Sequence, residues 1–381
     1  MIPLSVPNLT GNEEKYVKKC LDTGWVSTAG EFVNKFEKSF ANKIKMKDAV
    51  SVMNGTSALH MAMMQITNKE DIVILPNLSF VATANAAMYL GIEPVFIDID
   101  EDDWQMDLDL LEEFLSEECI SERNITKYKK NNKKIAAIVI VHNQGNMCDM
   151  DRLKSISKKF NVSLIEDAAE SLGSKYKGKD SGTFGEFGCF SFNGNKIITT
   201  GGGGMIVSKN KKMLNNIKHI STTAKVDPIK YFHDEVGYNY RLVNILAAIG
   251  LAQLENLELF ISSKRKTADF YREALNDIGD IRFQKIHSDV KSNEWLFTIR
   301  TNQSADLMNY LNKKGIMSRP FWMPMNMLPM YSNKIFFNKE NKSRSVHESC
   351  ITLPCSTNIT EAELNKVAEE IRNFYSDAKN F

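Results

Sequence analysis

The chain has 381 residues, 43% of them hydrophobic and 25% charged, and its formal net charge is +1. This composition is ordinary for a globular protein, and the balanced charge excludes a bulk field that would attract nucleic acid or an anionic membrane. The six cysteines lack metal-binding or disulfide spacing, no apolar run reaches the ~18 residues of a membrane span, and the N-terminus has no signal-peptide pattern, so we expect a cytoplasmic protein.

Short apolar runs alternate with amphipathic helical patterns through the first half of the chain. Seven runs are predicted to be strands, at residues 49–53, 72–75, 94–97, 135–141, 162–165, 187–192 and 205–207. Helices are predicted near residues 10–24, where a capping box at 10–13 opens the helix, and near 32–40, 57–65, 81–90, 109–117 and 150–160. This alternation predicts a mainly parallel sheet with helices on both faces. Ligands of such sheets lie beyond the carboxyl ends of the strands, where we place Asn54, Asp167 and Ser191.

The pattern changes after residue 242. Two long helical patterns, at residues 242–260 and 262–275, precede a strand at 296–299 and a helix at 304–314. We therefore predict an α/β fold with two domains. The large domain covers residues 1–250 and carries the seven-stranded sheet, and a smaller C-terminal α/β domain covers residues 251–381.

Lys196 lies between the strand-like run at 187–192 and four consecutive glycines at 201–204. Most lysines are solvated surface charges, but this setting suits an amine held near a cofactor. Upstream, an apolar run ends in acidic residues that include Asp167. A lysine that forms a Schiff base and an aspartate that pairs with a pyridinium nitrogen are the two protein groups that pyridoxal phosphate requires. The sequence therefore predicts a pyridoxal-phosphate site with Lys196 as its catalytic residue.

Asp167 is predicted to be buried at a strand end. A buried carboxylate is costly unless it is paired, and a protonated ring nitrogen would be such a partner. That pairing keeps the ring cationic, so that the cofactor accepts electrons from a substrate carbanion. The alternative is an aspartate that caps the next turn. Glu170 is predicted to lie near the ring hydroxyl, with an orientation toward solvent as its alternative.

Gly55, Thr56 and Ser57 follow a strand and open a helix. The N-terminus of a helix offers free N–H groups and the positive end of the helix dipole, so we predict that these residues bind the cofactor phosphate. A plain helix cap is the alternative. Ser191 is a further phosphate donor in this interpretation. Phe80 is predicted to stack on the cofactor ring, although an aromatic residue there is also typical of a core.

Substrate contacts are predicted for His142, Arg241 and Arg319. His142 follows the strand at 135–141, and the two arginines suit a nucleotide diphosphate or a donor carboxylate. For the arginines, a surface ion pair is the alternative. The six histidines show no paired spacing, so we predict no metal site.

Several segments of the chain form a recognisable set when taken together. They are Pro3-Leu4-Ser5-Val6-Pro7, Gly11-Asn12-Glu13, Gly24-Trp25-Val26-Ser27, Asn54-Gly55-Thr56-Ser57, Glu166-Asp167-Ala168-Ala169-Glu170, the Lys196 segment and Gly237-Tyr238-Asn239-Tyr240-Arg241-Leu242. Together they resemble the DegT/DnrJ/EryC1/StrS family of pyridoxal-phosphate sugar aminotransferases. The resemblance implies a type I aminotransferase fold and a homodimer with active sites at the interface. It implies that Asn239 reaches the partner subunit's cofactor phosphate, and that Phe80, Asp167, Glu170, Ser191 and Lys196 take the roles given above.

The segments at 21–27, 192–200 and 319–322 resemble enzymes that aminate C4 of nucleotide-linked 4-keto-6-deoxy sugars on routes to legionaminic acid or bacillosamine. This implies transfer from L-glutamate to a UDP- or GDP-linked 2-acetamido-4-keto-2,6-dideoxyhexose. The alternatives are another keto sugar such as GDP-4-keto-6-deoxymannose, a cofactor-binding regulator without turnover, and a lyase or dehydratase. Related dehydratases carry histidine in place of Lys196. Gln144 departs from the aromatic residue that many relatives carry, which leaves the sugar contacts there open.

Overall fold

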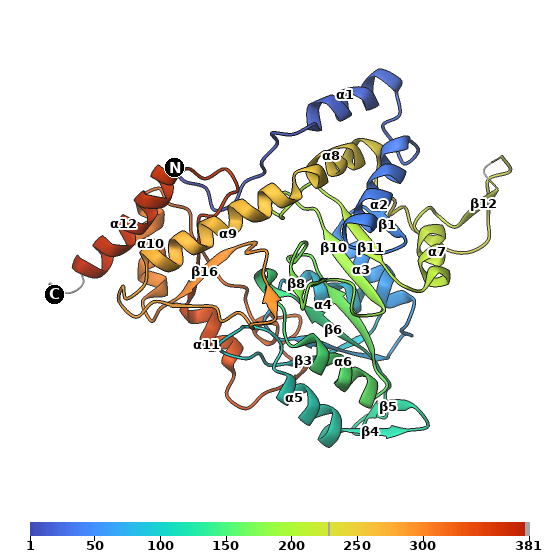
Figure 1. Cartoon of the computed structure of the whole chain (residues 1–381). Coiled ribbons are helices and arrows are strands. Elements are labelled where there is room, and N and C mark those ends of the chain that lie inside the picture. The colour runs from blue at the N-terminus through green and yellow to red at the C-terminus, as the bar shows by residue number, and fades with distance from the viewer. Residues whose placement is uncertain (228, 378–381) are drawn as a thin grey trace.

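The computed structural model describes residues 1–227 and 229–377 and is built around an eight-stranded sheet (Figure 1). Its order is β1-β11-β10-β7-β6-β2-β3-β18. Only β11 is antiparallel to its neighbours, so the predicted mainly parallel sheet is confirmed. The strands are β1 (Ala49–Val52), β2 (Ile72–Pro76), β3 (Glu93–Ile97), β6 (Ile135–Val141), β7 (Ser163–Asp167), β10 (Phe187–Ser191), β11 (Gly204–Val207) and β18 (Ile335–Phe337).

All seven predicted strands lie in this sheet, and β18 is the eighth that the sequence pattern missed. The central strands are continuous apolar runs because helices cover both faces. In β2 and β6 every residue is buried. Successive side chains point to opposite faces, so Val73 and Leu75 join one hydrophobic cluster while Ile72 and Ile74 join another.

Two layers of helices cover the sheet. One face packs against α3 (Gly55–Met64), α4 (Ala82–Tyr89) and α7 (Lys211–Ile220). The other face packs against α5 (Leu108–Glu113) and α6 (Met150–Lys159), and against α2 (Glu31–Lys43) and α8 (Asn244–Glu255). Phe36 and Phe40 of α2 contact Phe192 just beyond β10, which fixes that helix beside the Lys196 segment.

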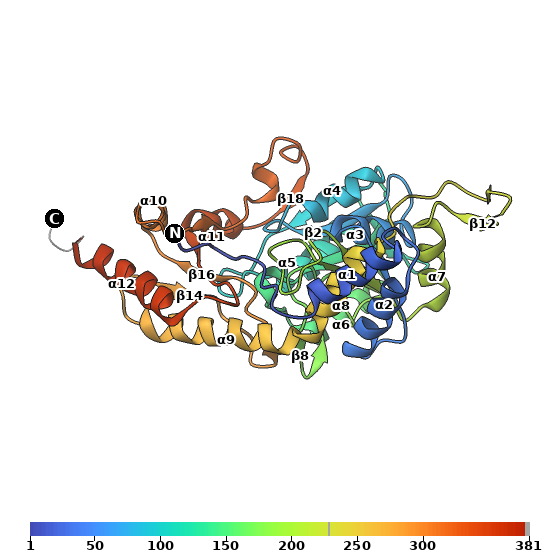
Figure 2. The same cartoon turned by 90° about the horizontal axis from the view of Figure 1, so that it is seen from above.

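The C-terminal part has its own antiparallel sheet, in the order β14-β16-β19-β17. The long helix α9 (Leu257–Ala274) connects the two sheets, and α12 lies at the far end of the molecule (Figures 1 and 2). The elements here are β14 (Arg282–Phe283), β16 (Phe297–Arg300), α10 (Ser304–Lys313), β17 (Arg319–Pro320), α11 (Lys342–Ser349), β19 (Cys350–Leu353) and α12 (Glu361–Asp377).

The predicted boundary at residue 250 falls inside α8. Two segments also cross between the parts. β18 follows the small sheet's β17 in the chain but pairs with β3 of the large sheet, and Ile2 pairs with Ile316. The division into residues 1–250 and 251–381 therefore stays a prediction.

Smaller elements lie around this framework. Among them are α1 (Glu13–Thr23), the hairpin β4 (Cys119–Glu122) and β5 (Ile125–Tyr128), and a small sheet of β15 (Val290–Lys291), β8 (Lys175–Tyr176) and β9 (Lys179–Asp180). Within the described residues no single helix is long and apolar enough to cross a membrane. α8 and α9 together pass by length and composition but meet at a 60° bend.

A hairpin of β12 (Lys225–Asp227) and β13 (Phe232–His233) projects from the body at the end opposite α12 (Figures 1 and 2). It exposes large apolar side chains, with Ile229 87% and Tyr231 74% accessible. Exposed apolar side chains gathered on one projecting element are typical of an interaction surface.

The glycine run at 201–204 separates the Lys196 segment from β11, and its last member makes the closest backbone contact. A Cβ atom on Gly204 would lie 2.5 Å from the Asn54 carbonyl oxygen, in the turn that begins α3. A Cβ atom on Gly202 would meet nothing nearer than the Met53 carbonyl oxygen, at 3.8 Å. Gly204 therefore allows the turn before α3 to pack directly on β11.

Gly204→Ala tests this packing. The added methyl group forces two backbone segments apart, so we expect the free energy of unfolding to fall by about 1–3 kcal/mol in urea denaturation. Gly202→Ala is the matched control and should stay close to wild type. Equal losses of stability in the two variants would show that the close contact at Gly204 is not their cause.

Candidate active site

A cavity of about 400 Å³ opens at the carboxyl ends of the parallel strands. Its walls come from segments that follow β1, β2, β7 and β10, which explains how residues far apart in sequence meet. Seven of the predicted site residues line it: Gly55, Thr56, Phe80, Asp167, Glu170, Ser191 and Lys196.

Lys196 extends into this cavity from the loop after β10. Its Nζ atom lies 3.8 Å from the centre of the Trp295 ring and 3.7 Å from Oε1 of Glu170. Burial lowers the pKa of the amine, and the carboxylates of Glu170 and Asp167 oppose that shift. A lysine in this environment loses its proton more readily than a surface lysine, as a nucleophilic amine must.

Asp167 is the last residue of β7 and is almost fully buried. Its Oδ2 atom accepts a hydrogen bond from Oγ1 of Thr83 at 2.6 Å, and its Oδ1 atom accepts one from the N–H of Ala169 at 3.1 Å. Burial raises the pKa of this carboxyl group even so. A cationic group beside it would offset the cost of keeping it ionised.

Glu170 lies on the same wall and is only 3% exposed, so the alternative that it points to solvent is excluded. Its Oε2 atom accepts a hydrogen bond from the N–H of Gln144 at 2.7 Å, and burial raises the pKa of this carboxyl group also. Gln144 is held with a φ of 57°, and Gly145 follows with a φ of 89°. This turn aims a backbone N–H at Glu170.

The N-terminus of α3 forms another wall. Oδ1 of Asn54 accepts the N–H of Ser57 at 2.8 Å and caps the helix, which leaves the N–H groups of Gly55 and Thr56 ahead of the first intrahelical bond. A Cβ atom on Gly55 would lie 2.8 Å from Cβ of Ser191, so only glycine fits there. Ser57 itself lines the adjoining pocket with His60 rather than this cavity.

The residues present fit pyridoxal phosphate. The cavity has the size of a small-molecule site, a helix N-terminus suits the phosphate, and burial raises the pKa of the Asp167 carboxyl group, which a cationic ring would offset. An amine with a lowered pKa lies in the same cavity. The donor set thus matches the cofactor predicted from the sequence.

Comparison with known proteins gives the same answer. Residues 7–372 match the model of the DegT/DnrJ/EryC1/StrS aminotransferase family. The chain belongs to this family. It is therefore an aminotransferase, and its cofactor is pyridoxal phosphate.

Three relatives align over nearly their whole length. The chain is 39% identical to GDP-perosamine synthase of Escherichia coli O157:H7 over 99% of each chain. It is 35% identical to GDP-perosamine synthase of Vibrio cholerae, over 99% of this chain and 100% of that one. It is 30% identical to the UDP-4-amino-4,6-dideoxy-N-acetyl-beta-L-altrosamine transaminase of Campylobacter jejuni serotype O:23/36 (strain 81-176), over 98% and 100%.

Solved structures agree in fold. A DegT/DnrJ/EryC1/StrS aminotransferase from Brucella abortus superposes with a TM-score of 0.88 at 26% identity, covering 96% of this chain and 95% of that one. The putative sugar aminotransferase Spr1654 of Streptococcus pneumoniae, in its PMP-form, has the same TM-score at 25% identity, covering 99% and 100%. These likenesses confirm the predicted aminotransferase fold.

Two predicted substrate residues, His142 and Arg241, do not line the cavity. His142 is fully buried, and its Nε2 atom lies 3.0 Å from Oε2 of Glu166. Arg241 is also buried, where it pairs with Glu37, donates to the Ser51 carbonyl oxygen at 3.2 Å and lines a separate pocket. Because both side chains contact buried carboxylates, we assign them a structural role, and their contacts with the substrate stay predictions.

Two other predicted residues, Arg319 and Asn239, also lie outside the cavity, but both are exposed. Arg319 is exposed on β17 and donates to the carbonyl oxygen of Ser318 at 2.8 Å. Asn239 is exposed and lines a separate pocket with Thr222 and Lys225. Their contacts with the substrate and with the partner subunit's cofactor stay predictions.

Thr83, Asn195, Trp295 and Trp322 are among the cavity side chains that the sequence pattern missed. Trp322 lay in a segment that carried the family resemblance, which was a usable signal. Trp295 belongs to no motif, and its hydrogen-bond partner Asn195 is 100 residues away in the chain. Its place became evident only from the fold.

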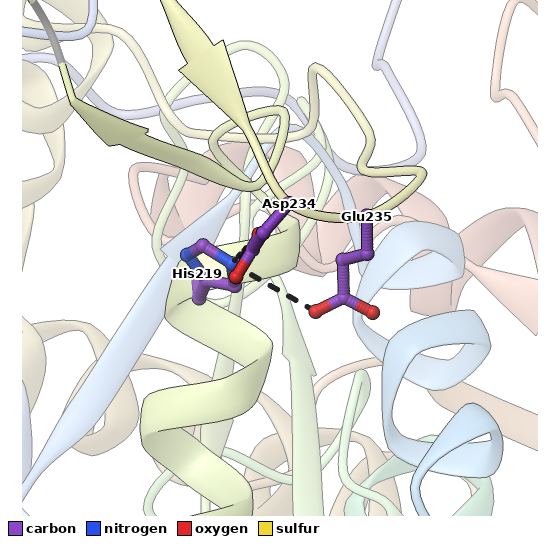
Figure 3. A group of neighbouring side chains, drawn as sticks. All are labelled: His219, Asp234 and Glu235. Carbon is purple, nitrogen blue, oxygen red and sulfur yellow. Dashed lines mark hydrogen bonds and ion pairs between the residues drawn. The ribbon is translucent and has the colours of Figure 1, made fainter.

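One cluster of potential metal ligands occurs among the described residues, away from the cavity lining (Figure 3). Nε2 of His219, at the end of α7, lies 2.7 Å from Oδ1 of Asp234 and 3.8 Å from Oε1 of Glu235. The two acids follow β13. These contacts between His219 and the two acids hold the base of the projecting hairpin against α7, which gives the cluster a structural role.

Paired substitutions test the structural assignment of Arg241. Arg241→Met leaves the buried Glu37 with only the half-exposed Lys218, 3.7 Å away, as a cation, so we expect a loss of up to about 3–5 kcal/mol in the free energy of unfolding, measured in urea. Arg319→Met removes an exposed arginine and should change stability by less than about 0.5 kcal/mol. Near-wild-type stability of the Arg241 variant would contradict this assignment.

Proposed function

We propose that this aminotransferase moves the amino group of L-glutamate to the C4 ketone of a nucleotide-linked 4-keto-6-deoxy sugar. The observation that carries the proposal is the meeting of Lys196, Asp167 and the α3 N-terminus in one cavity. Among nucleotides we favour GDP, with GDP-4-keto-6-deoxymannose as the substrate, since relatives at 39% and 35% identity are GDP-perosamine synthases. The UDP-linked 2-acetamido sugar of the legionaminic acid or bacillosamine type is the second candidate, favoured by the 30% identical transaminase.

Each wall of the cavity has a separate task in this reaction. When bound, pyridoxal phosphate withdraws electrons from the carbon that carries the amino group. Asp167, held by Thr83 and Ala169, pairs with the ring nitrogen and keeps it protonated. The N–H groups of Gly55 and Thr56 bind the phosphate.

Lys196 moves the proton. Its Nζ atom takes the proton from the α-carbon of the donor and later returns one to C4 of the sugar. The amine is suited to this because burial lowers its pKa, whereas a surface lysine would remain protonated at neutral pH. Phe80 and Trp322 line the cavity near one another, with ring centres 5.4 Å apart, and exclude water from that side.

We also propose that the active unit is a homodimer. The hairpin of β12 and β13 exposes apolar side chains that a second subunit would cover, among them Val226, Ile229 and Tyr231. Asn239 lies just beyond this hairpin and outside the cavity of its own chain. A two-fold dimer that buries the hairpin brings Asn239 to the partner's phosphate site.

The substrate assignment is tested with purified protein, pyridoxal phosphate and glutamate. GDP-4-keto-6-deoxymannose and the UDP-linked 2-acetamido-4-keto-2,6-dideoxyhexose are offered separately, and mass spectrometry follows the amino sugar while 2-oxoglutarate is counted. We expect amination of the GDP sugar. Preference for the UDP sugar would select the second candidate, and a glutamate-induced change in cofactor absorbance without any aminated sugar would favour a regulator.

Lys196→Met should lower the rate of amination by about 10²–10⁴-fold or more, because it removes both the attachment point and the proton carrier. Lys179→Met is the matched control. Burial lowers the pKa of Lys179 to about 8, but this lysine lies on β9 and does not line the cavity. An equal loss of activity in the two variants would show that the loss at Lys196 does not report a catalytic role.

The dimer proposal predicts complementation between two inactive variants. Lys196→Ala and Asn239→Ala chains are unfolded together, mixed in equal amounts and refolded. If Asn239 serves the partner's site, one site of each mixed dimer is intact, so roughly a quarter of wild-type activity returns. No recovery from dimers shown by mass spectrometry to be mixed would place Asn239 in the site of its own chain.

A further inference from the structure

Trp295 is a fully buried side chain that forms part of the cavity wall. It comes from the C-terminal part of the chain, in the segment between β15 and β16. The Nζ atom of Lys196 lies 3.8 Å from the centre of its ring. The nearest carboxylate oxygen, on Glu170, is 3.7 Å from the same atom, beyond the length of a strong charge-assisted hydrogen bond.

Three hydrogen bonds fix Trp295 in this position. Its Nε1–H group donates to the carbonyl oxygen of Asn195 at 2.7 Å, next to the catalytic lysine. Its backbone N–H donates to Oδ1 of Asn293 at 2.9 Å, and its carbonyl oxygen accepts from Nζ of the buried Lys264 at 2.8 Å. The indole ring is therefore a rigid surface whose edge is joined to the backbone that carries Lys196.

A buried ammonium group needs a partner that replaces water. The face of an indole ring is such a partner, because its quadrupole attracts a cation without forming a directed bond. A directed hydrogen bond to a carboxylate would hold the amine in one place. A ring face stabilises the charge and still lets the amine leave.

We propose that the face of Trp295 receives the amine of Lys196 whenever the amine is not attached to the cofactor, and that this contact stabilises its protonated form. The inference rests on the proposed role of Lys196 as proton carrier. In each half of the reaction the freed amine must accept a proton from one carbon and hold it until it reaches another. Trp295 thus acts as a positioning residue that offsets part of the effect of burial.

The test uses the protein saturated with pyridoxamine 5′-phosphate, the aminated cofactor, which leaves Lys196 unattached. An amine-reactive acylating reagent is applied across a pH series, and peptide mapping by mass spectrometry follows labelling at position 196. The midpoint of that series reports protonation of the amine, whereas accessibility changes only the overall rate. In Trp295→Leu we expect the midpoint to fall by about one pH unit, since a desolvated cation–π contact is worth about 1–2 kcal/mol.

Trp322→Leu is the matched control. It also removes a tryptophan from the cavity wall, but the amine does not lie on its ring, so the midpoint should stay at the wild-type value. Trp295→Phe keeps an aromatic face but loses the bond to Asn195, and its midpoint should lie closer to wild type than that of Trp295→Leu. A midpoint shift in Trp295→Phe as large as in Trp295→Leu would overturn the proposal, because the ring face would not be the cause.

Fluorinated tryptophan offers a measurement that does not depend on a substitution at position 295. Fluorine withdraws charge from the face of the ring but keeps the shape of the indole and its N–H group. In protein that carries Trp322→Leu, we expect the labelling midpoint to fall stepwise with the number of fluorine atoms, and an unchanged midpoint would overturn the proposal. Because labelling needs no sugar, a failed substrate assay leaves this result independent.

Discussion

The burial of one amine and two carboxyl groups around a single cavity is the constraint on which the site depends. Burial disfavours every charged form, so it lowers the pKa of Lys196 and raises those of Asp167 and Glu170. The protein tolerates this cost because hydroxyl and backbone N–H groups surround the acids, from Thr83 and Ala169 on one and Gln144 on the other. A cationic ring beside Asp167 would offset the remaining cost of keeping that carboxyl group ionised.

The sheet provides this arrangement through close backbone contact. The turn before α3 must approach both β10 and β11 for its N–H groups to face the same cavity as Lys196. Glycine makes both approaches possible, Gly55 against Ser191 and Gly204 against the Asn54 carbonyl. Even a methyl group at either glycine would move the N-terminus of α3 away from the segment that carries Lys196. The absence of a side chain at Gly55 and Gly204 therefore shapes the cavity as much as the side chains that line it.

The sequence predicted the parts of this structure that local patterns encode. The seven large-domain strands are buried on both faces, which makes their apolar runs long and unambiguous, whereas β18 has only three half-buried residues. Lys196 and Asp167 were predicted correctly as cavity residues because their chemistry is distinctive. The positions of His142 and Arg241 outside the cavity were not predicted, because a sequence does not show which buried carboxylate a basic residue will meet, here Glu166 and Glu37. Trp295 was missed because its hydrogen-bond partner Asn195 is 100 residues away in the chain.

The C-terminal part therefore does more than cover the cofactor site. Its two tryptophans continue an aromatic series from Phe80 of the large domain, with ring centres 5.4 Å apart between Phe80 and Trp322 and 6.4 Å apart between Trp322 and Trp295. The series ends under the amine of Lys196. Since Trp322 faces the cavity and Trp295 is bonded to the Asn195 carbonyl, any displacement of the C-terminal segment alters both the space for substrate and the surroundings of the amine. In the proposed reaction, these rings would therefore connect the space for substrate with the position of the amine that transfers the proton.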